Sequence, residues 1–247
     1  MENKNRSWLG LSLLGLLLAV GIIISTLVIS NTVERVKTQN QRITVKGFAE
    51  RTITSDVAVW EGQITTRSAE LVTAYDSLQA DLEKVLSYFQ QQGIPAENIS
   101  TSAVTTRIQY KRTIRDVMTN IREGYTLVQT VKITSPNVEK IATIANEVTV
   151  LIKEGIEFDS FTPQYFYTKL DDIKIELLGE ATKNAGMRAE QLAENSGSEV
   201  GNLKYASQGV FQITPLYSTQ VSGYGVYDTS TIEKSVKAVV TIEYSIR

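Results

Sequence analysis

A long uncharged segment, Trp8–Ile29, separates the start of the chain from everything that can form a water-soluble domain. It reads "WLGLSLLGLLLAVGIIISTLVI" and holds 22 residues without Asp, Glu, Lys or Arg. At about 1.5 Å of rise per residue, a helix of this length spans a hydrocarbon core of roughly 30 Å. The sequence therefore predicts a transmembrane helix over 8–29, between a cytoplasmic tail (1–7) and a juxtamembrane linker (30–41).

A cleaved signal peptide is the alternative reading of this segment. The apolar run exceeds the roughly 7–15 residues of a signal-peptide core, and no clear small-residue cleavage site follows Ile29, which favours an uncleaved signal anchor. Lys4 and Arg6 favour a cytoplasmic N-terminus, and Arg35 and Lys37 on the other side make that bias modest. We expect a single-pass protein of the cytoplasmic membrane, with its main domain on the extracytoplasmic (periplasmic or extracellular) side.

Two residue types that carry much of enzyme chemistry are absent. The chain has no histidine and no cysteine, which rules out Ser-His-Asp and Cys-His arrangements and zinc sites that need either residue. Catalysis by Asp, Glu, Lys, Tyr or Ser stays open. The formal net charge of −2 gives no basic excess for nucleic acid. We expect no metal, no cofactor and no nucleic-acid partner.

Three segments have the apolar period of helices. Apolar side chains recur at three-and-four spacing over 69–92, and Gly93 and Pro95 then end the pattern. A second stripe covers about 136–155, and a third, Ala-rich, covers about 170–195. Each is predicted to be a helix that packs one face against the core.

Alternating segments around these helices predict strands in two similar groups. The expected strands cover 43–48, 53–66, 99–112, 124–135, 156–168, 203–214 and 235–247. They form two β-α-β-β units, about 42–135 and 156–247, joined by the helix at about 136–155. The stretch "KRTIRDVMTNIRE" in the first unit is expected to be a solvated charged hairpin. The predicted class is α+β: a transmembrane helix, then largely antiparallel sheets with helices on one face.

The chain resembles the SIMPL-domain family, the YggE-like bacterial envelope proteins, over nearly all of 42–247. The resemblance lies in "ITVKGFAERTITSDVAVW", "LEKVLSYFQQQGIPAENISTSAVTTRIQY", "GYTLVQTVKI", "EATKNAGMRAEQLAENSGSEVGNLKYAS" and "VKAVVTIEYSI", which occur in the family's order. It implies an envelope protein without an established catalytic constellation. It also implies large ring-shaped homo-oligomers and a link to stress tolerance, as in some relatives.

Gly47 lies between two predicted strands and is interpreted as structural. A phosphate-binding loop needs several glycines at the start of a helix, whereas the neighbours of Gly47 are expected to use their backbone amides in a sheet. Gly47 is therefore expected to bend the sheet. The family often has a second glycine two residues later, where this chain has Ala49.

Two tyrosine-rich stretches are the candidate contact sites. "FTPQYFYTK" (161–169) contains Tyr165 and Tyr167, and aromatic side chains of this density serve a core, a subunit contact or a ligand site. "TPLYSTQVSGYGVYDTST" (214–231) contains Tyr217, Tyr224 and Tyr227 in a long loop, which fits an interaction loop and a mobile excursion equally.

The expected function is a non-enzymatic, membrane-anchored envelope protein that forms a homo-oligomer. The alternative is an extracytoplasmic ligand-binding or sensing module that uses residues 161–169 and 214–231. A third possibility, a hydrolase built on Asp, Glu, Lys or Tyr, requires a deep pocket with converging carboxylates.

Overall fold

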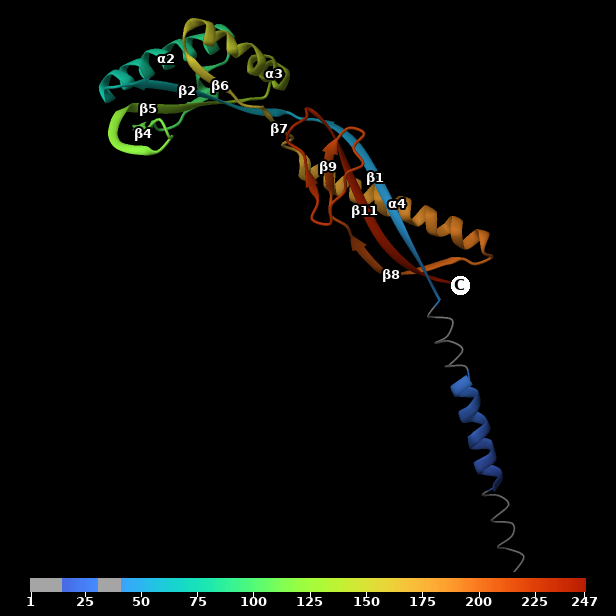
Figure 1. Ribbon diagram of the computed structural model, residues 1–247. Coiled ribbons are helices and arrows are strands. Elements are labelled where there is room, and N and C mark those ends of the chain that lie inside the picture. Colours follow the sequence, from blue (N-terminus) through green and yellow to red (C-terminus); the bar gives the residue numbers. More distant parts are fainter. Residues whose placement is uncertain (1–14, 31–40) are drawn as a thin grey trace, which may run out of the picture. The chain divides into compact units, whose positions relative to one another are not determined.

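The computed structural model describes residues 15–30 and 41–247 (Figure 1). Residues 15–30 are helical and their apolar side chains are exposed. Within the described ranges, no helix is both long enough and apolar enough to cross a membrane. The predicted tail (1–7), the first part of the predicted transmembrane helix (8–14) and nearly all of the linker (31–40) lie outside the described residues.

The main domain alternates strands with three long helical segments. In chain order its elements are β1 (Arg42–Thr54), β2 (Val57–Ser68), α2 (Leu71–Gln91), η1 (Ala96–Asn98), β3 (Ile99–Thr101), β4 (Thr105–Arg112), β5 (Met118–Ser135), α3 (Val138–Glu147), η2 (Val148–Glu154), β6 (Glu157–Ser160), β7 (Gln164–Phe166), α4 (Leu170–Asn195), β8 (Val200–Gln208), β9 (Gln212–Pro215), β10 (Val226–Tyr227) and β11 (Glu233–Ile246). The predicted α+β class is confirmed. The expected helix over 136–155 is α3 followed by the tighter helix η2.

Two sheets organise these strands. One has the order β3-β5-β2-β6, with β4 also pairing β5 and β7 also pairing β2; these pairs are all antiparallel. The other has the order β1-β11-β9-β10, with β8 also pairing β11. Within it β9 and β10 are parallel, so this second sheet is mixed.

The domain forms two compact units, and each draws on separated parts of the chain. The first contains residues 41–49, Glu176–Val210 and Ala238–Arg247; the second contains Glu50–Ile175 and Phe211–Lys237. This division differs from the predicted units at 42–135 and 156–247. The single strand expected at 156–168 is two short strands, β6 and β7, that both pair with β2. Pairing between distant strands is a long-range choice that a local alternation pattern does not contain.

The core of the second unit lies between its sheet and the helices α2 and α3, which cover the same face (Figure 1). Trp60 on β2 is its largest fully buried side chain. Its ring meets Phe89 of α2 edge-on at 5.6 Å and stacks near Phe158 of β6 at 6.1 Å between centroids. Its indole Nε1 donates to Ser160 Oγ at 3.2 Å, so the polar atom of the buried ring has a partner.

In the first unit, Gly47 permits a close approach between β1 and α4. A Cβ added at Gly47 would overlap the backbone oxygen of Ala181 and lie 2.7 Å from the Cβ of Ala185. The neighbouring Phe48 N donates to Asn184 Oδ1 at 3.1 Å, and Arg188 donates to the Lys46 oxygen at 3.3 Å. The expectation that Gly47 separates two strands is wrong, because β1 runs unbroken from Arg42 to Thr54. Gly47 is needed for helix packing.

Replacement of Gly47 by alanine should destabilise the domain by about 1–3 kcal/mol, because the added methyl forces α4 away from β1. The matched control is Gly179→Ala on α4, where an added Cβ meets nothing within 4 Å. That variant should stabilise the helix by roughly 0.5–1 kcal/mol. Urea unfolding of both variants measures the difference, and equal effects would contradict the packing argument.

Candidate functional site

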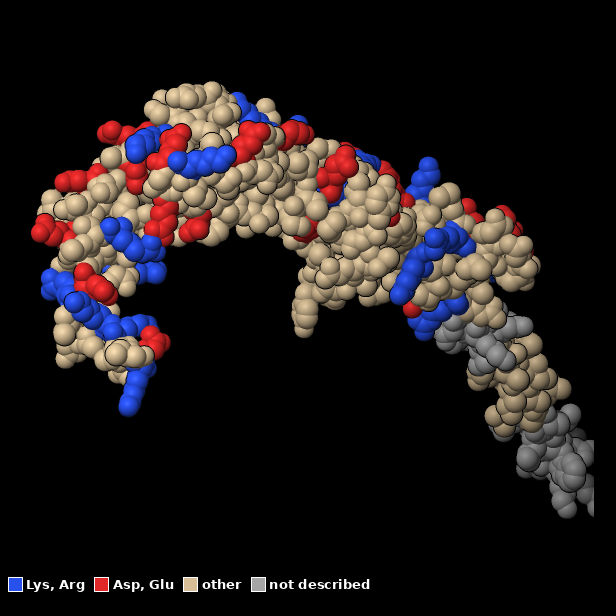
Figure 2. Space-filling model, turned by 45° about the horizontal axis from the view of Figure 1, so that its top comes forward, with Lys and Arg blue, Asp and Glu red and all other residues tan. Residues whose placement is uncertain are grey.

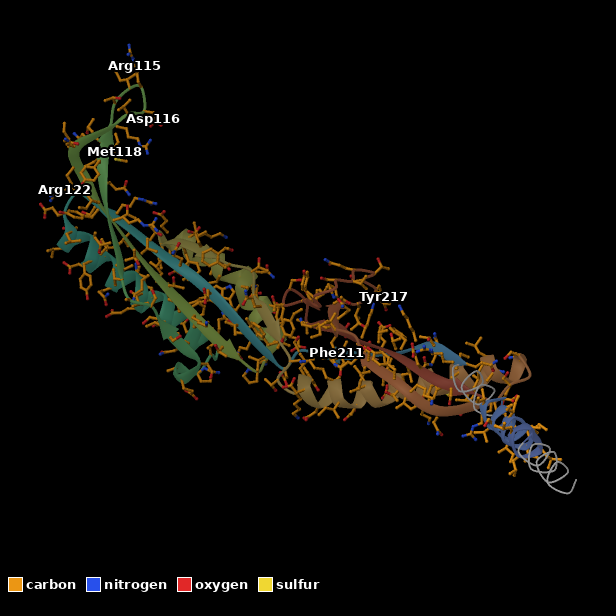
Figure 3. All side chains as sticks on the ribbon, turned by 90° about the horizontal axis from the view of Figure 1, so that it is seen from below. Arg115, Asp116, Met118, Arg122, Phe211 and Tyr217 are labelled. Atoms are coloured by element: carbon orange, nitrogen blue, oxygen red, sulfur yellow. The ribbon has the colours of Figure 1, made fainter. Side chains whose placement is uncertain are left out.

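The surface with the most exposed aromatic side chains is a segment we call the tyrosine loop, residues 216–232. It connects β9 to β11 within the second unit and includes the short strand β10. Tyr217 is 96% exposed and Tyr224 is 100% exposed, while Tyr227 on β10 is about half exposed. Figure 3 shows Tyr217 with its side chain directed away from the sheet. Tyr217 also has φ +62°, a left-handed conformation that non-glycine residues adopt at a cost.

Buried Gln212 on β9 holds the middle of the tyrosine loop. Its Nε2 donates to the Ser222 backbone oxygen at 2.8 Å, and its Oε1 accepts from Ser222 N at 3.2 Å. The side-chain amide of Gln212 thus bonds both backbone groups of Ser222, as the backbone of a neighbouring strand would. The segment between Tyr217 and Tyr224 is therefore tied to the sheet at its centre.

Asp228 organises the end of the loop. One carboxylate oxygen accepts from Ser230 N at 3.1 Å and Ser230 Oγ at 2.7 Å. The other accepts from Thr231 N at 3.2 Å and from the Thr231 hydroxyl. These are the local bonds with which an aspartate closes a turn. Burial on its own raises the pKa of Asp228, but the hydrogen bonds from Thr231 and Ser230 and the charge of Lys234 outweigh it and lower the pKa to about 2.

Lys234 at the start of β11 is 1% exposed and contacts both Asp228 and Thr231. We call Asp228, Ser230, Thr231 and Lys234 together the clamp. The Lys234 Nζ donates to the Thr231 backbone oxygen and lies 3.4 Å from Asp228 Oδ2. Burial lowers the pKa of Lys234, and the attraction of Asp228 opposes that shift. A buried ammonium requires such partners, because leaving it unpaired would cost several kcal/mol, on the order of 3–5.

Lys237 lies three residues further along β11 and holds the other end of the loop. Its Nζ donates to the Ser218 backbone oxygen at 2.8 Å and lies 3.6 Å from Glu50 Oε1. Glu50 on β1 also accepts a hydrogen bond from Ser235 Oγ. Three anchors, at Ser218, Ser222 and Asp228, thus restrain a loop whose tyrosines remain exposed. These bonds fit an ordered loop better than a mobile excursion.

The other two candidate tyrosines lie on or beside β7. Tyr165 is 6% exposed and belongs to the core of the second unit. Its backbone N donates to the Thr229 oxygen at 2.8 Å, which links β7 to the tyrosine loop. Tyr167 follows β7 and is half-buried. The structure brings Tyr217, Tyr224 and Tyr227 into one loop and assigns Tyr165 to the interior.

The residues that hold the loop were not identified from the sequence. The run "DTST" at 228–231 contained a usable signal, because an aspartate followed by hydroxyl residues is typical of a turn. The roles of Gln212 and Lys234 had no local signal, since burial of an alternating polar residue depends on what covers the strand. No group of three or more acidic side chains that could hold a metal occurs in residues 15–30 and 41–247.

The first unit contains an apolar hollow of about 340 Å³ between α4 and the strands β8 and β11. It is lined mainly by Leu178, Leu203, Val240, Ile242 and Tyr244. The same helix packs closely against β1 at Gly47. The hollow has no converging carboxylates in its lining.

The clamp predicts how stability depends on pH. Because Asp228 has its pKa lowered from 3.8 to about 2, the stability that it contributes is present above pH 3.8 and is lost as pH falls through 2. A shift of this size corresponds to about 2 kcal/mol at neutral pH. The free energies of unfolding of the protein and of Asp228→Asn should differ by about that amount at pH 6, and the difference should shrink toward pH 2.

Asp171→Asn is the control for this measurement. Its carboxylate is 93% exposed and pairs with Lys174 at the surface at 3.0 Å, and an exposed ion pair of this kind contributes little. A pH-independent difference for Asp228→Asn would contradict the clamp.

Comparison with known proteins connects this architecture to one family. The family model SIMPL, described as a protein of unknown function (DUF541), matches residues 43–244, which is well over half of the chain. None of the curated proteins compared with the chain matches it. The matched range begins in β1 and ends in β11, so it includes the close packing at Gly47 and the tyrosine loop. The chain therefore belongs to the SIMPL family.

Proposed function

We propose that this protein is a non-enzymatic, membrane-anchored envelope protein whose copies associate through the tyrosine loop. The single observation that carries the proposal is the pairing of two fully exposed tyrosines with a loop that is held by buried Gln212 and partly buried Lys237. A restrained loop loses little conformational entropy on binding, and tyrosine supplies a large contact area with few rotatable bonds.

The anchoring half of the proposal rests on the sequence. Trp8–Ile29 is uncharged over a length that suits a bilayer, and Lys4 and Arg6 precede it. In this reading the protein crosses the cytoplasmic membrane once, and residues 42–247 lie on the extracytoplasmic side. The absence of histidine and cysteine supports a non-catalytic role.

The proposal for self-association combines the loop with the implication of the family resemblance, in which some relatives form rings and some are linked to stress tolerance. Tyr217 and Tyr224 flank the bond between Gln212 and Ser222, so both are displayed from one restrained segment. The alternative, a ligand-binding module that uses the aromatic strand, is less well supported because Tyr165 is buried in the core.

Tyr217→Ser combined with Tyr224→Ser should reduce the assembly mass of the full-length protein purified in detergent. The loss of two central aromatic anchors weakens an interface more than the loss of peripheral residues. Multi-angle light scattering or native mass spectrometry measures the effect.

Tyr75→Ser combined with Tyr205→Ser is the matched control, because both of these tyrosines are about half exposed but lie on α2 and β8. That pair should leave the mass unchanged. A monomeric parent protein would refute self-association, and an unchanged mass for the loop variant would refute the loop as the contact.

A further inference from the structure

The hairpin formed by β4 and the first part of β5 extends beyond the sheet to which it belongs. Pairing between β2 and β5 ends at Ser68 and Tyr125. Past that point β5 pairs only with β4, through Tyr110 with Arg122 and Arg112 with Met118. A Cβ at Gly124 would lie 2.6 Å from the Ser68 oxygen, so the glycine marks where the two-stranded ribbon leaves the sheet. Figure 3 shows Arg115 at its tip and Met118 and Arg122 along its length.

Neither face of this ribbon is covered. All residues from Thr105 to Met118 are exposed. Six of the large side chains along the ribbon are apolar: Ile108, Tyr110, Ile114, Val117, Met118 and Ile121. Ile108 and Tyr110 lie on β4 and Met118 and Ile121 on β5, so both strands of the ribbon carry exposed apolar side chains. Single exposed apolar side chains are common on protein surfaces, whereas a cluster of six on one ribbon indicates an interaction site.

The ribbon is also the basic part of an acidic chain. Residues 105–123 contain five Lys or Arg and two acidic residues, a balance of +3, whereas the whole chain has a net charge of −2. The remaining residues therefore carry −5. Arg112 pairs with Asp116 at 2.9 Å, and Arg122 bonds the Tyr125 hydroxyl. No ion pair to Arg107, Lys111 or Arg115 is found among the described residues. Blue atoms gather on this projecting end in Figure 2.

The tip is a closed turn that presents Ile114 and Arg115 together. Thr113 N donates to the Val117 oxygen at 2.9 Å, and Asp116 N donates to the Thr113 oxygen at 2.8 Å. Val117 N donates to Thr113 Oγ1 at 3.1 Å, and Asp116 has φ +58°. These bonds fix the turn, so its exposed apolar side chain is displayed by an ordered segment.

We propose that this hairpin inserts its tip into the surface of an anionic lipid bilayer. Exposed apolar side chains along both strands and at the tip suit a medium that surrounds the ribbon, whereas the flat face of a protein partner would cover one side. The cations without a carboxylate partner lie beside these apolar groups and match lipid phosphates above the hydrocarbon. The insertion is independent of the tyrosine loop and of self-association.

The test uses the absence of cysteine, which allows one label at a chosen position. Full-length Ile114→Cys, carrying an apolar environment-sensitive fluorophore and held in phosphatidylcholine nanodiscs, is mixed with vesicles of phosphatidylcholine alone or with added phosphatidylglycerol. The emission should shift to the blue, and brominated lipid should quench it, only when phosphatidylglycerol is present. A label at Glu154→Cys, at the exposed end of η2 and outside both the hairpin and the tyrosine loop, should not respond.

Charge variants connect the response to the hairpin. Lys111→Gln with Arg115→Gln should weaken vesicle binding by on the order of tenfold or more, because each basic residue near an anionic surface contributes substantially. Lys153→Gln with Lys204→Gln removes the same charge from exposed residues on η2 and β8 and should have little effect. Both pairs lie outside the core, and a second label at Asn120→Cys confirms the result independently of Ile114.

Several outcomes would overturn the proposal. Equal responses with neutral and anionic vesicles, or no response at either label, would exclude an anionic bilayer as the partner. Equal weakening by the two charge variants would show a general charge effect. A response that follows protein concentration without vesicles would identify a second copy of the chain as the occupant. In each case the assembly mass measured for the tyrosine-loop variant is a separate result.

Discussion

The pairing of β2 with its neighbours supports the two exposed surfaces of the second unit, the hairpin of β4 and β5 and the tyrosine loop. β2 pairs with β5 along eleven positions, from Ala58 with Ser135 to Ser68 with Tyr125, and with β6 and β7 on its other edge. The same strand contributes Trp60 to the core, between α2 and β6. Because β5 is longer than β2, its excess length projects as the basic hairpin. Because β7 bonds Thr229, the opposite edge of β2 leads to the tyrosine loop.

The two exposed surfaces have different chemistry and different restraint. The tyrosine loop is uncharged at its tips and is held at three points by buried or partly buried side chains, which suits a specific contact between proteins. The hairpin is basic, carries exposed apolar side chains on both strands and is restrained only by its own turn and strand bonds, which suits a less specific lipid surface. A protein with one contact for its own copies and another for a membrane could hold an assembly at the bilayer. The ion pair in the clamp contributes to the restraint of the tyrosine loop. Burying the Lys234 ammonium without the Asp228 carboxylate would cost free energy of folding.

Helices could be predicted from the sequence, and their partners could not. The segment predicted over 69–92 is α2 at Leu71–Gln91, and the one predicted over 170–195 is α4 over the same residues. Helical periodicity is local, so a window of the sequence contains it. The strands were located approximately, but β1 was expected to break at Gly47, and residues 156–168 were expected to be one strand of the second predicted unit, whereas they contain β6 and β7, which pair with β2. Strand partners depend on contacts far apart in sequence, and alternation is the same whichever partner is chosen.

The candidate site, like the fold, could be predicted only in part from the sequence. Composition by itself excluded histidine and cysteine chemistry, and spacing located the loop with Tyr217, Tyr224 and Tyr227. Only the tertiary structure separated these exposed tyrosines from Tyr165, because burial depends on the helices that cover β7 and its sheet. It also showed that the exposed, charged hairpin expected from the sequence carries six exposed apolar side chains. Residue type and local period are properties of the chain, whereas which face is covered is a property of the packed sheet and helices.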